Sequence, residues 1–226
     1  MDATQKLKTL SSIREAKGEL GELRIDIAID QENKTLSITD RGVGMTAEEI
    51  DKYINQVAFS GAEEFLEKYK GQNENNIIGH FGLGFYSSFM VSDRVDIFSK
   101  SFREGSAAVH WECDGSPEFS LEETDKQDRG TSIVLHLNED SREFLDAHRV
   151  RTVLDKFCRF LPVPVFFENE QINQTNPAWT KKPTELTTED YQQFYRELYP
   201  MSEAPLFWIH LNVDYPFNLT GILYFP

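Results

Sequence analysis

Asp40-Arg41-Gly42-Val43-Gly44-Met45 follows a strand-like run, and farther along the chain Gly79-His80-Phe81-Gly82-Leu83-Gly84-Phe85 runs into a helix-like one. Both stretches place glycines where one regular element ends and another begins. Because glycine has no side chain, the backbone at such junctions can turn sharply and come close to a ligand. The two glycine-rich turns are therefore the first candidates for a binding site.

In the first turn, the carboxylate of Asp40 can accept the exocyclic N–H of a flat base that lies against Gly42 and Gly44. This combination would select adenine, and one charge-assisted hydrogen bond of this kind is worth about 1.5–3 kcal/mol. Considered alone, the hexapeptide is equally typical of a plain hairpin or helix-entry turn with an aspartate cap.

In the second turn, the glycines between Gly79 and Phe85 let successive backbone N–H groups converge on an anion at the start of a helix. The Gly-Lys-Ser/Thr of a P-loop is absent, and the glycines lack the order of a dinucleotide-binding fold. Together the two turns predict the two halves of a nucleotide pocket.

The hydrophobic pattern predicts an α+β fold, a two-layer sandwich of helices and sheet. Alternating apolar residues around a polar turn predict a hairpin over 23–38, and Thr46-Ala47-Glu48-Glu49 is a capping box that opens a helix. Further helices are expected at 2–16, 63–69, 85–90, 142–161 (as one or two helices) and 189–199, and further strands at 95–98, 107–111, 119–121, 131–137, 163–167, 207–213 and 219–225.

Composition divides the chain into three parts. Residues 1–168 are expected to form one domain, and the polar, Asn- and Pro-containing stretch 169–184 is expected to be a linker. Residues 185–226 are too few for a confident core of their own, so they are expected to begin a second domain.

The chain has 226 residues, with 23 basic against 38 acidic residues and a net charge of −15. The electrostatic field of this negative charge repels phosphate backbones and anionic membrane surfaces. Neither nucleic acid nor a membrane is therefore an expected partner. A nucleotide would have to be held by backbone N–H groups, which act at contact range. Cys113 and Cys158 have no metal-type or redox spacing, and we see no secretory leader, which favours a cytoplasmic protein.

Several short motifs occur in a specific order: Asp40 to Thr46, Ser60-Gly61, Ile78 to Ser87, Val91 to Val95, Trp111-Glu112, and Arg129-Gly130-Thr131. This order closely resembles the ATP-binding N-terminal domain of the ninety-kilodalton heat-shock chaperones, with the bacterial high-temperature protein G branch nearest. The resemblance covers nearly the whole chain, because residues 179–183 and 219–226 resemble the opening of that family's middle domain.

The resemblance implies the Bergerat ATP-binding fold, shared with gyrase, mismatch-repair proteins and sensor histidine kinases. It implies that Asp40 reads the adenine amino group of ATP or ADP, assisted by Gly44 and Thr131, and that Met45 and Val134 wall the base. Residues 55–77 would include a closing lid. Backbone N–H groups for the phosphates would come from Gly79, Phe81, Gly82, Gly84 and Phe85.

The resemblance also aligns Asp2 to Leu7 with the end of the family's first nucleotide-binding helix. A glutamate that activates water and an asparagine that binds Mg²⁺ would precede this chain, so we expect neither a catalytic residue nor a metal ligand in it. Loss of a general base typically costs about 10²–10⁴ in rate, so slow or no ATP hydrolysis is expected. Asp2 and Lys6 are candidates for the pocket, with a frayed, solvated helix start as the alternative.

For the longer parent protein, the resemblance implies an ATPase that is homodimeric and binds unfolded or partly folded client proteins. The 226-residue chain by itself is expected to be a monomer. Two alternatives stay open: a histidine-kinase-type catalytic domain on the same fold, and a nucleotide-binding scaffold that does not hydrolyse ATP. Autophosphorylation would identify the former, although the five histidines suit it poorly.

Overall fold

The structure is a computed structural model, and it describes residues 1–12, 20–56, 84–213 and 219–226. The chain divides between Asn173 and Gln174 into two compact units. That these units correspond to a nucleotide-binding domain and the start of a middle domain stays a proposal.

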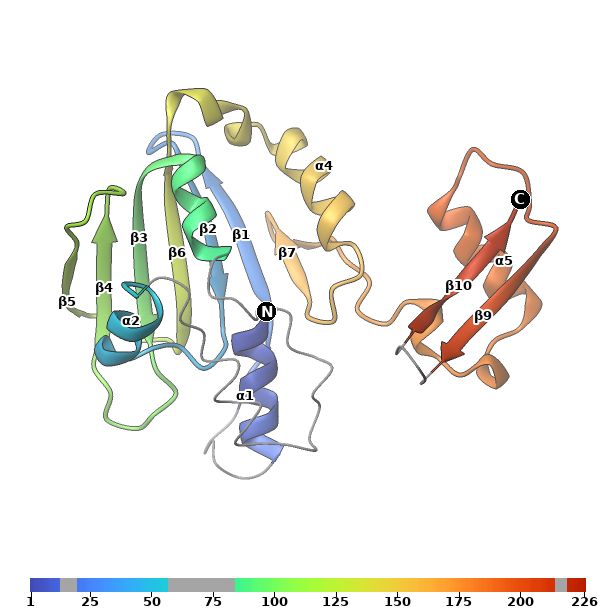
Figure 1. The fold of residues 1–226 in the computed structure, drawn as a ribbon, viewed down its shortest axis with the longest axis horizontal. Coiled ribbons are helices and arrows are strands. Elements are labelled where there is room, and N and C mark those ends of the chain that lie inside the picture. The colour runs from blue at the N-terminus through green and yellow to red at the C-terminus, as the bar shows by residue number, and fades with distance from the viewer. Residues whose placement is uncertain (13–19, 57–83, 214–218) are drawn as a thin grey trace. The chain divides into compact units, whose positions relative to one another are not determined.

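An eight-stranded sheet with the order β5-β4-β3-β6-β2-β1-β7-β8 forms the centre of the first unit (Figure 1). Its neighbours are antiparallel except for β1 and β7, which are parallel. The strands are β1 (Ile25–Asp30), β2 (Thr35–Asp40), β3 (Ser92–Lys100), β4 (Ala108–Cys113), β5 (Ser120–Thr124), β6 (Gly130–Leu137), β7 (Val165–Phe167) and β8 (Glu170–Gln171).

The hairpin predicted around residues 23–38 is β1 and β2, which pair with Ile27 opposite Ile38. In its turn, the carboxylate of Asp30 accepts hydrogen bonds from the backbone N–H and the amide nitrogen of Asn33, at 2.9 and 2.7 Å. Lys34 then takes a positive φ of 55°. Asp and Asn hold such turns because their short side chains bond to nearby backbone.

Helices pack against one face of the sheet, which confirms the two-layer α+β sandwich (Figure 1). One hydrophobic cluster joins Ile50 to Val95, Ile97 and Trp111, and a second cluster joins Leu154 and its neighbours to β1 and β7. The helices are α1 (Asp2–Ser12), α2 (Ala47–Tyr53), the 3-10 helices η2 (Gly84–Met90) and η3 (Glu139–Leu145), and α4 (Ala147–Cys158).

One predicted helix differs in type, and one region forms two helices, which the sequence pattern allowed. The segment expected at 85–90 is a seven-residue 3-10 helix, η2, and β3 begins two residues after it. The segment expected at 142–161 divides at Asp146, whose extended backbone and side chain cap α4 through the N–H of Arg149 at 3.0 Å. The helix expected at 63–69 lies outside the described residues.

The first unit ends with a buried asparagine. The side-chain oxygen of Asn173 accepts from the backbone N–H of Val165 at 2.8 Å, and its amide nitrogen donates to the carbonyls of Leu161 and Val163 at 2.8 and 2.9 Å. β8 pairs with β7 just before it. Residues 170–173, which the composition placed in a linker, thus pack on the first unit.

The second unit has the expected helix, α5 (Thr188–Leu198), and the two expected strands, β9 (Phe207–Val213) and β10 (Leu219–Phe225), which pair antiparallel. Tyr191 joins them, since its ring stacks on Trp208 at 5.1 Å and its carbonyl accepts from the hydroxyl of Tyr224 at 2.9 Å. The 3-10 helices η4 (Ala178–Thr180) and η5 (Pro183–Glu185) precede α5.

Candidate functional site

Asp40 ends β2, directly opposite Ile25 of β1. Ile25 is buried in the core, so the carboxylate of Asp40 faces the helix layer. Its Oδ1 accepts the backbone N–H of Gly42 at 2.7 Å. Burial raises the pKa of the Asp40 carboxyl above its usual value, while hydrogen bonds from the backbone of Gly42 and Thr131 and the charge of Lys126 oppose that rise. Carboxylates whose pKa is raised by burial are common at binding and catalytic sites.

The glycines after Asp40 let the loop lie directly on neighbouring backbone. A Cβ on Gly42 would press on the backbone of Ala3 in α1, and the N–H of Val43 donates to the carbonyl of Ala3 at 3.2 Å. Gly44 has a φ of +61°, and a Cβ there would overlap the carbonyl oxygen of Lys100 at the end of β3. Both glycines are therefore required by close approach, and Gly44 also by its left-handed backbone.

A chain of hydrogen bonds connects this loop to Thr131. The hydroxyl of Ser99 accepts the backbone N–H of Met45 at 2.8 Å and lies 2.8 Å from the hydroxyl of Thr131. Ser99 is fully buried in β3. Its own hydrogen can go to Thr131 or, at 3.5 Å, to the carbonyl of Gly130. When Thr131 accepts it, the hydrogen of the Thr131 hydroxyl remains for a ligand.

The helix layer does not seal the sheet beside Asp40. Ile38 lies on the same face as Asp40 in a central strand, opposite Ile27 on one side and Ile133 on the other, yet it is 37% exposed. Ile27 belongs to one core cluster and Ile133 packs on the other. In the described part of the chain, an apolar side chain on a central strand thus stays partly uncovered two residues before Asp40.

The prediction that Val134 forms a wall of the base site is wrong. Val134 pairs with Ser37 and Asp96, and Asp96 points away from the helix layer because Val95 and Ile97 on either side of it are in the core. Side chains alternate along a strand, so Val134 lies on the face opposite to Thr131. Ile133 is the β6 residue on the Thr131 side. Met45 packs against the first core cluster, and its expected contact with the base stays a prediction.

Of the expected phosphate-binding residues, Gly84 and Phe85 are described and begin η2. The Phe85 ring packs edge-on against Trp111 at 5.6 Å, and the hydroxyl of neighbouring Tyr86 donates to the carbonyl of Ile54 at 2.8 Å. These contacts place the end of the second glycine turn beside α2. Gly79, Phe81 and Gly82 lie outside the described residues, as does the expected lid from residue 57 onward.

At the near end of the expected lid, Asn55 is described. Its side-chain oxygen accepts the indole N–H of Trp111 at 2.8 Å. Asp2 and Lys6 lie in the first two turns of α1, whose Ala3 contacts Gly42. Whether these two side chains meet a ligand stays a prediction.

Two positioning residues were missed by sequence reasoning. Arg129 donates to the carbonyls of Leu20 at 2.5 Å and Arg41 at 3.4 Å, which ties the turn before β6 to the Asp40 loop. Ser99 is the other, and the sequence contains a signal for it. Val95, Ile97 and Ser99 alternate along one strand, so the hydroxyl of Ser99 is expected to face the core. A buried polar side chain of that kind must find a partner.

Within the described residues, no helix has the length and apolar character needed to cross a membrane.

Two family models match different parts of the chain. Residues 14–132 match the family described as histidine kinase-, DNA gyrase B-, and HSP90-like ATPase, and residues 163–226 match the Hsp90 protein family. The chain is 61% identical to the chaperone protein HtpG of Porphyromonas gingivalis and to that of Bacteroides fragilis, in each case over 100% of this chain and 35% of the relative. It is 41% identical to the HtpG of Nitratidesulfovibrio vulgaris, over 89% of this chain and 33% of that protein. The chain therefore spans about a third of the length of these relatives.

Proposed function

We propose that this chain, which belongs to the histidine kinase-, DNA gyrase B-, and HSP90-like ATPases and within them to the Hsp90 family, binds an adenine nucleotide at Asp40. We further propose that it is the nucleotide-binding part of an ATP-dependent chaperone. The observation that carries the proposal is the partly uncovered sheet at Ile38, with the carboxylate of Asp40 and the hydroxyl of Thr131 on the same face.

The Asp40 carboxylate has hydrogen-bonding capacity beyond its contact with the loop. It accepts the N–H of Gly42 and a backbone hydrogen bond from Thr131, while an ionised carboxylate offers about four acceptor sites. The exocyclic amine of adenine would occupy a remaining site. Guanine carries a carbonyl at the equivalent position, which would face the carboxylate without a hydrogen to share.

The hydroxyl of Thr131 supplies a second polar contact. Ser99 accepts the N–H of Met45, so it holds the glycine loop and the Thr131 hydroxyl in one arrangement. Because the Ser99 hydrogen is best placed for Thr131, the Thr131 hydrogen can point to a ring nitrogen of the base. We assign Gly44 and Met45 to the surface on which the base lies.

The phosphates would be held by backbone N–H groups of the second glycine turn, from Gly79 to Phe85. ATP or ADP supplies the reactive phosphate chemistry, and Mg²⁺ would enter the proposal only through those phosphates. We assign no described residue to the metal and none to catalysis. Lid closure over residues 55–77 and slow hydrolysis by the 226-residue chain both stay predictions.

The whole protein's activity is proposed by analogy with its relatives, whose printed name is chaperone. For the longer protein we propose ATP hydrolysis coupled to the handling of unfolded clients by a homodimer. A cytoplasmic location fits the two free thiols, Cys113 and Cys158. Light scattering on the 226-residue chain tests its expected monomeric state.

Calorimetric titration of ADP, ATP and GTP tests the proposal. Asp40→Ala should weaken ADP binding roughly 10- to 150-fold, which corresponds to the loss of about 1.5–3 kcal/mol. The matched control is Asp30→Ala at the end of the neighbouring strand, which should bind like the wild type. GTP should bind much more weakly than ATP.

The proposal fails if wild type and Asp40→Ala bind ADP equally, or if wild-type protein with a cooperative thermal transition binds neither nucleotide. A separate phosphate-release assay tests the expected slow hydrolysis. Transfer of labelled phosphate to the protein would favour the histidine-kinase alternative.

A further inference from the structure

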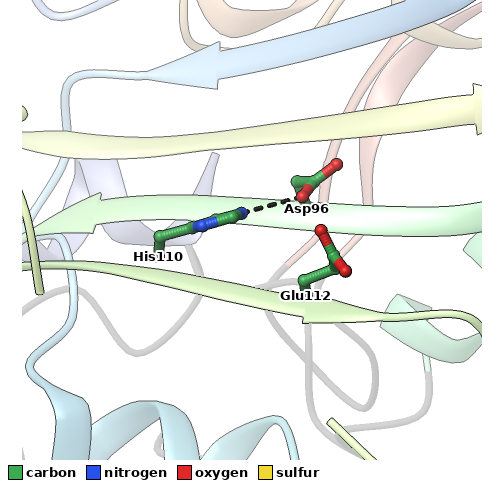
Figure 2. Close-up of side chains that lie close together, drawn as sticks. All are labelled: Asp96, His110 and Glu112. Atoms are coloured by element: carbon green, nitrogen blue, oxygen red, sulfur yellow. Dashed lines mark hydrogen bonds and ion pairs between the residues drawn. The ribbon is translucent and has the colours of Figure 1, made fainter. Parts of the chain in front are cut away.

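A second polar site lies on the face of the sheet opposite the helix layer. Asp96 of β3 points to that face, and its cross-strand partner on β4 is Glu112. His110 lies two residues before Glu112 and shares the same side. Figure 2 shows His110 and Asp96 directed at each other with Glu112 beside them. Among the described residues, these three bring one possible metal-ligand atom each to within 4.8 Å of one another.

His110 is held as a metal-binding histidine would be. Its ring stacks on Phe98 at 4.3 Å with an interplanar angle of 3°, which fixes the direction of both nitrogens. Nε2 lies 2.8 Å from Oδ1 of Asp96, and Nδ1 lies 3.6 Å from a carboxylate oxygen of Glu122. Metal-ligating histidines commonly donate their second N–H to a carboxylate, and the exposed Glu122 side chain would reach hydrogen-bonding distance with a small shift.

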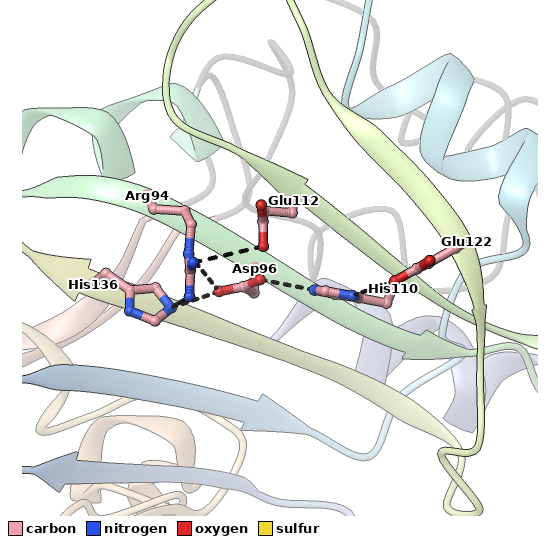
Figure 3. A network of polar contacts seen from close by, with 6 residues as sticks. All are labelled: Arg94, Asp96, His110, Glu112, Glu122 and His136. Atoms are coloured by element: carbon pink, nitrogen blue, oxygen red, sulfur yellow. Dashed lines mark hydrogen bonds and ion pairs between the residues drawn. The ribbon is translucent and has the colours of Figure 1, made fainter. Parts of the chain in front are cut away.

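The charge around Asp96 is negative overall. Asp96, Glu112 and Glu122 stand against one cation, Arg94, when the histidines are neutral (Figure 3). The Asp96 side chain is only 7% exposed, and its strand, β3, lies between β4 and β6 in the sheet.

Arg94 lies where a bound cation would compensate these carboxylates. Its guanidinium is 3.4 Å from Asp96 and 3.8 Å from Glu112, and it also lies 2.8 Å from Nε2 of His136. The Arg94 side chain is 45% exposed, so it can leave toward solvent. A dication would replace its charge at the same two carboxylates.

We propose that Asp96, His110 and Glu112 form a binding site for a transition-metal dication of the Zn²⁺ class, with Glu122 as the outer partner of His110. Imidazole together with carboxylates suits Zn²⁺, Ni²⁺ and Cu²⁺, whereas Mg²⁺ and Ca²⁺ prefer oxygen ligands alone. Three protein ligands leave at least one position for water. The site is on the other face of the sheet from Asp40, so it does not depend on the proposed nucleotide binding.

Titration of the full chain with Zn²⁺, and in parallel with Mg²⁺, tests the site. His110→Gln and Glu112→Gln should each weaken Zn²⁺ binding by about tenfold or more, since even outer-shell changes cost about 10–100-fold. His148→Gln is the matched control, because His148 is an exposed histidine on α4. Arg94→Gln should tighten Zn²⁺ binding by removing the competing charge.

Thermal unfolding with and without Zn²⁺ gives a second readout and shows that each variant folds. Zn²⁺ should raise the Tm of wild type and Arg94→Gln more than that of His110→Gln. The proposal is overturned if folded wild type shows no saturable Zn²⁺ binding, if His110→Gln binds as well as His148→Gln, or if Mg²⁺ binds as tightly as Zn²⁺. In the last case the face is only an acidic surface.

Discussion

The carboxylate of Asp40, which we propose binds the nucleotide, is buried at a cost to folding. Burial raises its folded-state pKa above 3.8, so the penalty for the charged form is fully present above the folded pKa and disappears as the pH falls through it toward 3.8. We expect Asp40→Asn to stabilise the ligand-free protein at neutral pH by about 0.5–2 kcal/mol, while it weakens nucleotide binding. Urea unfolding across the acid range should show this gain fading as the pH falls.

Asp30 serves as a control, because its pKa is shifted in the opposite direction to that of Asp40. Hydrogen bonds from Asn33 lower its pKa, so its contribution to stability is present above 3.8 and lost as the pH falls through the lowered folded value. Asp30→Asn should destabilise the protein at neutral pH. If both variants shift stability in the same direction, the environment assigned to Asp40 is wrong.

Gly44 permits a second residue-scale prediction. Gly44→Ala meets both an unfavourable φ of +61° and the backbone of Lys100, whereas Gly105→Ala meets only a positive φ of +79° in open space. Strained backbone alone costs about 1–3 kcal/mol, so Gly44→Ala should be the more damaging by a clear margin. Chemical denaturation of both variants measures the difference, and equal losses would contradict the close approach of the loop to β3.

At the scale of elements, the start of α2 is fixed by a capping box. The hydroxyl of Thr46 accepts the N–H of Glu49 at 3.3 Å, and the carboxylate of Glu49 accepts the N–H of Thr46 at 2.9 Å. Glu49 also pairs with Arg103 at 2.9 Å. Thr46→Ala should cost about 0.5–2 kcal/mol in thermal unfolding, and Thr46→Ser should retain most of the stability, because serine caps as well. An equal loss in the two variants would mean that the hydroxyl does not cap the helix.

At the scale of the whole molecule, the boundary of the first unit can be tested by truncation. A polypeptide that ends at Asn173 keeps the three hydrogen bonds of that side chain, whereas one that ends at residue 168 leaves the partners on Leu161, Val163 and Val165 unpaired. We expect the shorter polypeptide to be less stable by at least about 1–3 kcal/mol, the cost of one buried unpaired group. Asn173→Ala in the longer polypeptide should reproduce most of the loss. Equal stability of residues 1–168 and 1–173 would show that Asn173 belongs to a linker.

The sequence by itself determined what depends on neighbours along the chain. The hairpin turn at Asp30, the capping box at Thr46 and the hydrogen bond from Gly42 to Asp40 are local, because both partners lie within a few residues. For the same reason, the α+β class and most helices and strands could be predicted from periodicity. The order of the motifs was enough to identify the family.

Only the tertiary structure decided which side chains share a face. Val134 was misplaced because strand register, rather than the motif, sets the side on which a residue lies, and Ser99 and Arg129 act on segments far away in sequence. The approach of Asp96, His110 and Glu112 likewise depends on the pairing of β3 with β4. Such contacts join residues that the sequence keeps apart, so their geometry exists only once the sheet has formed.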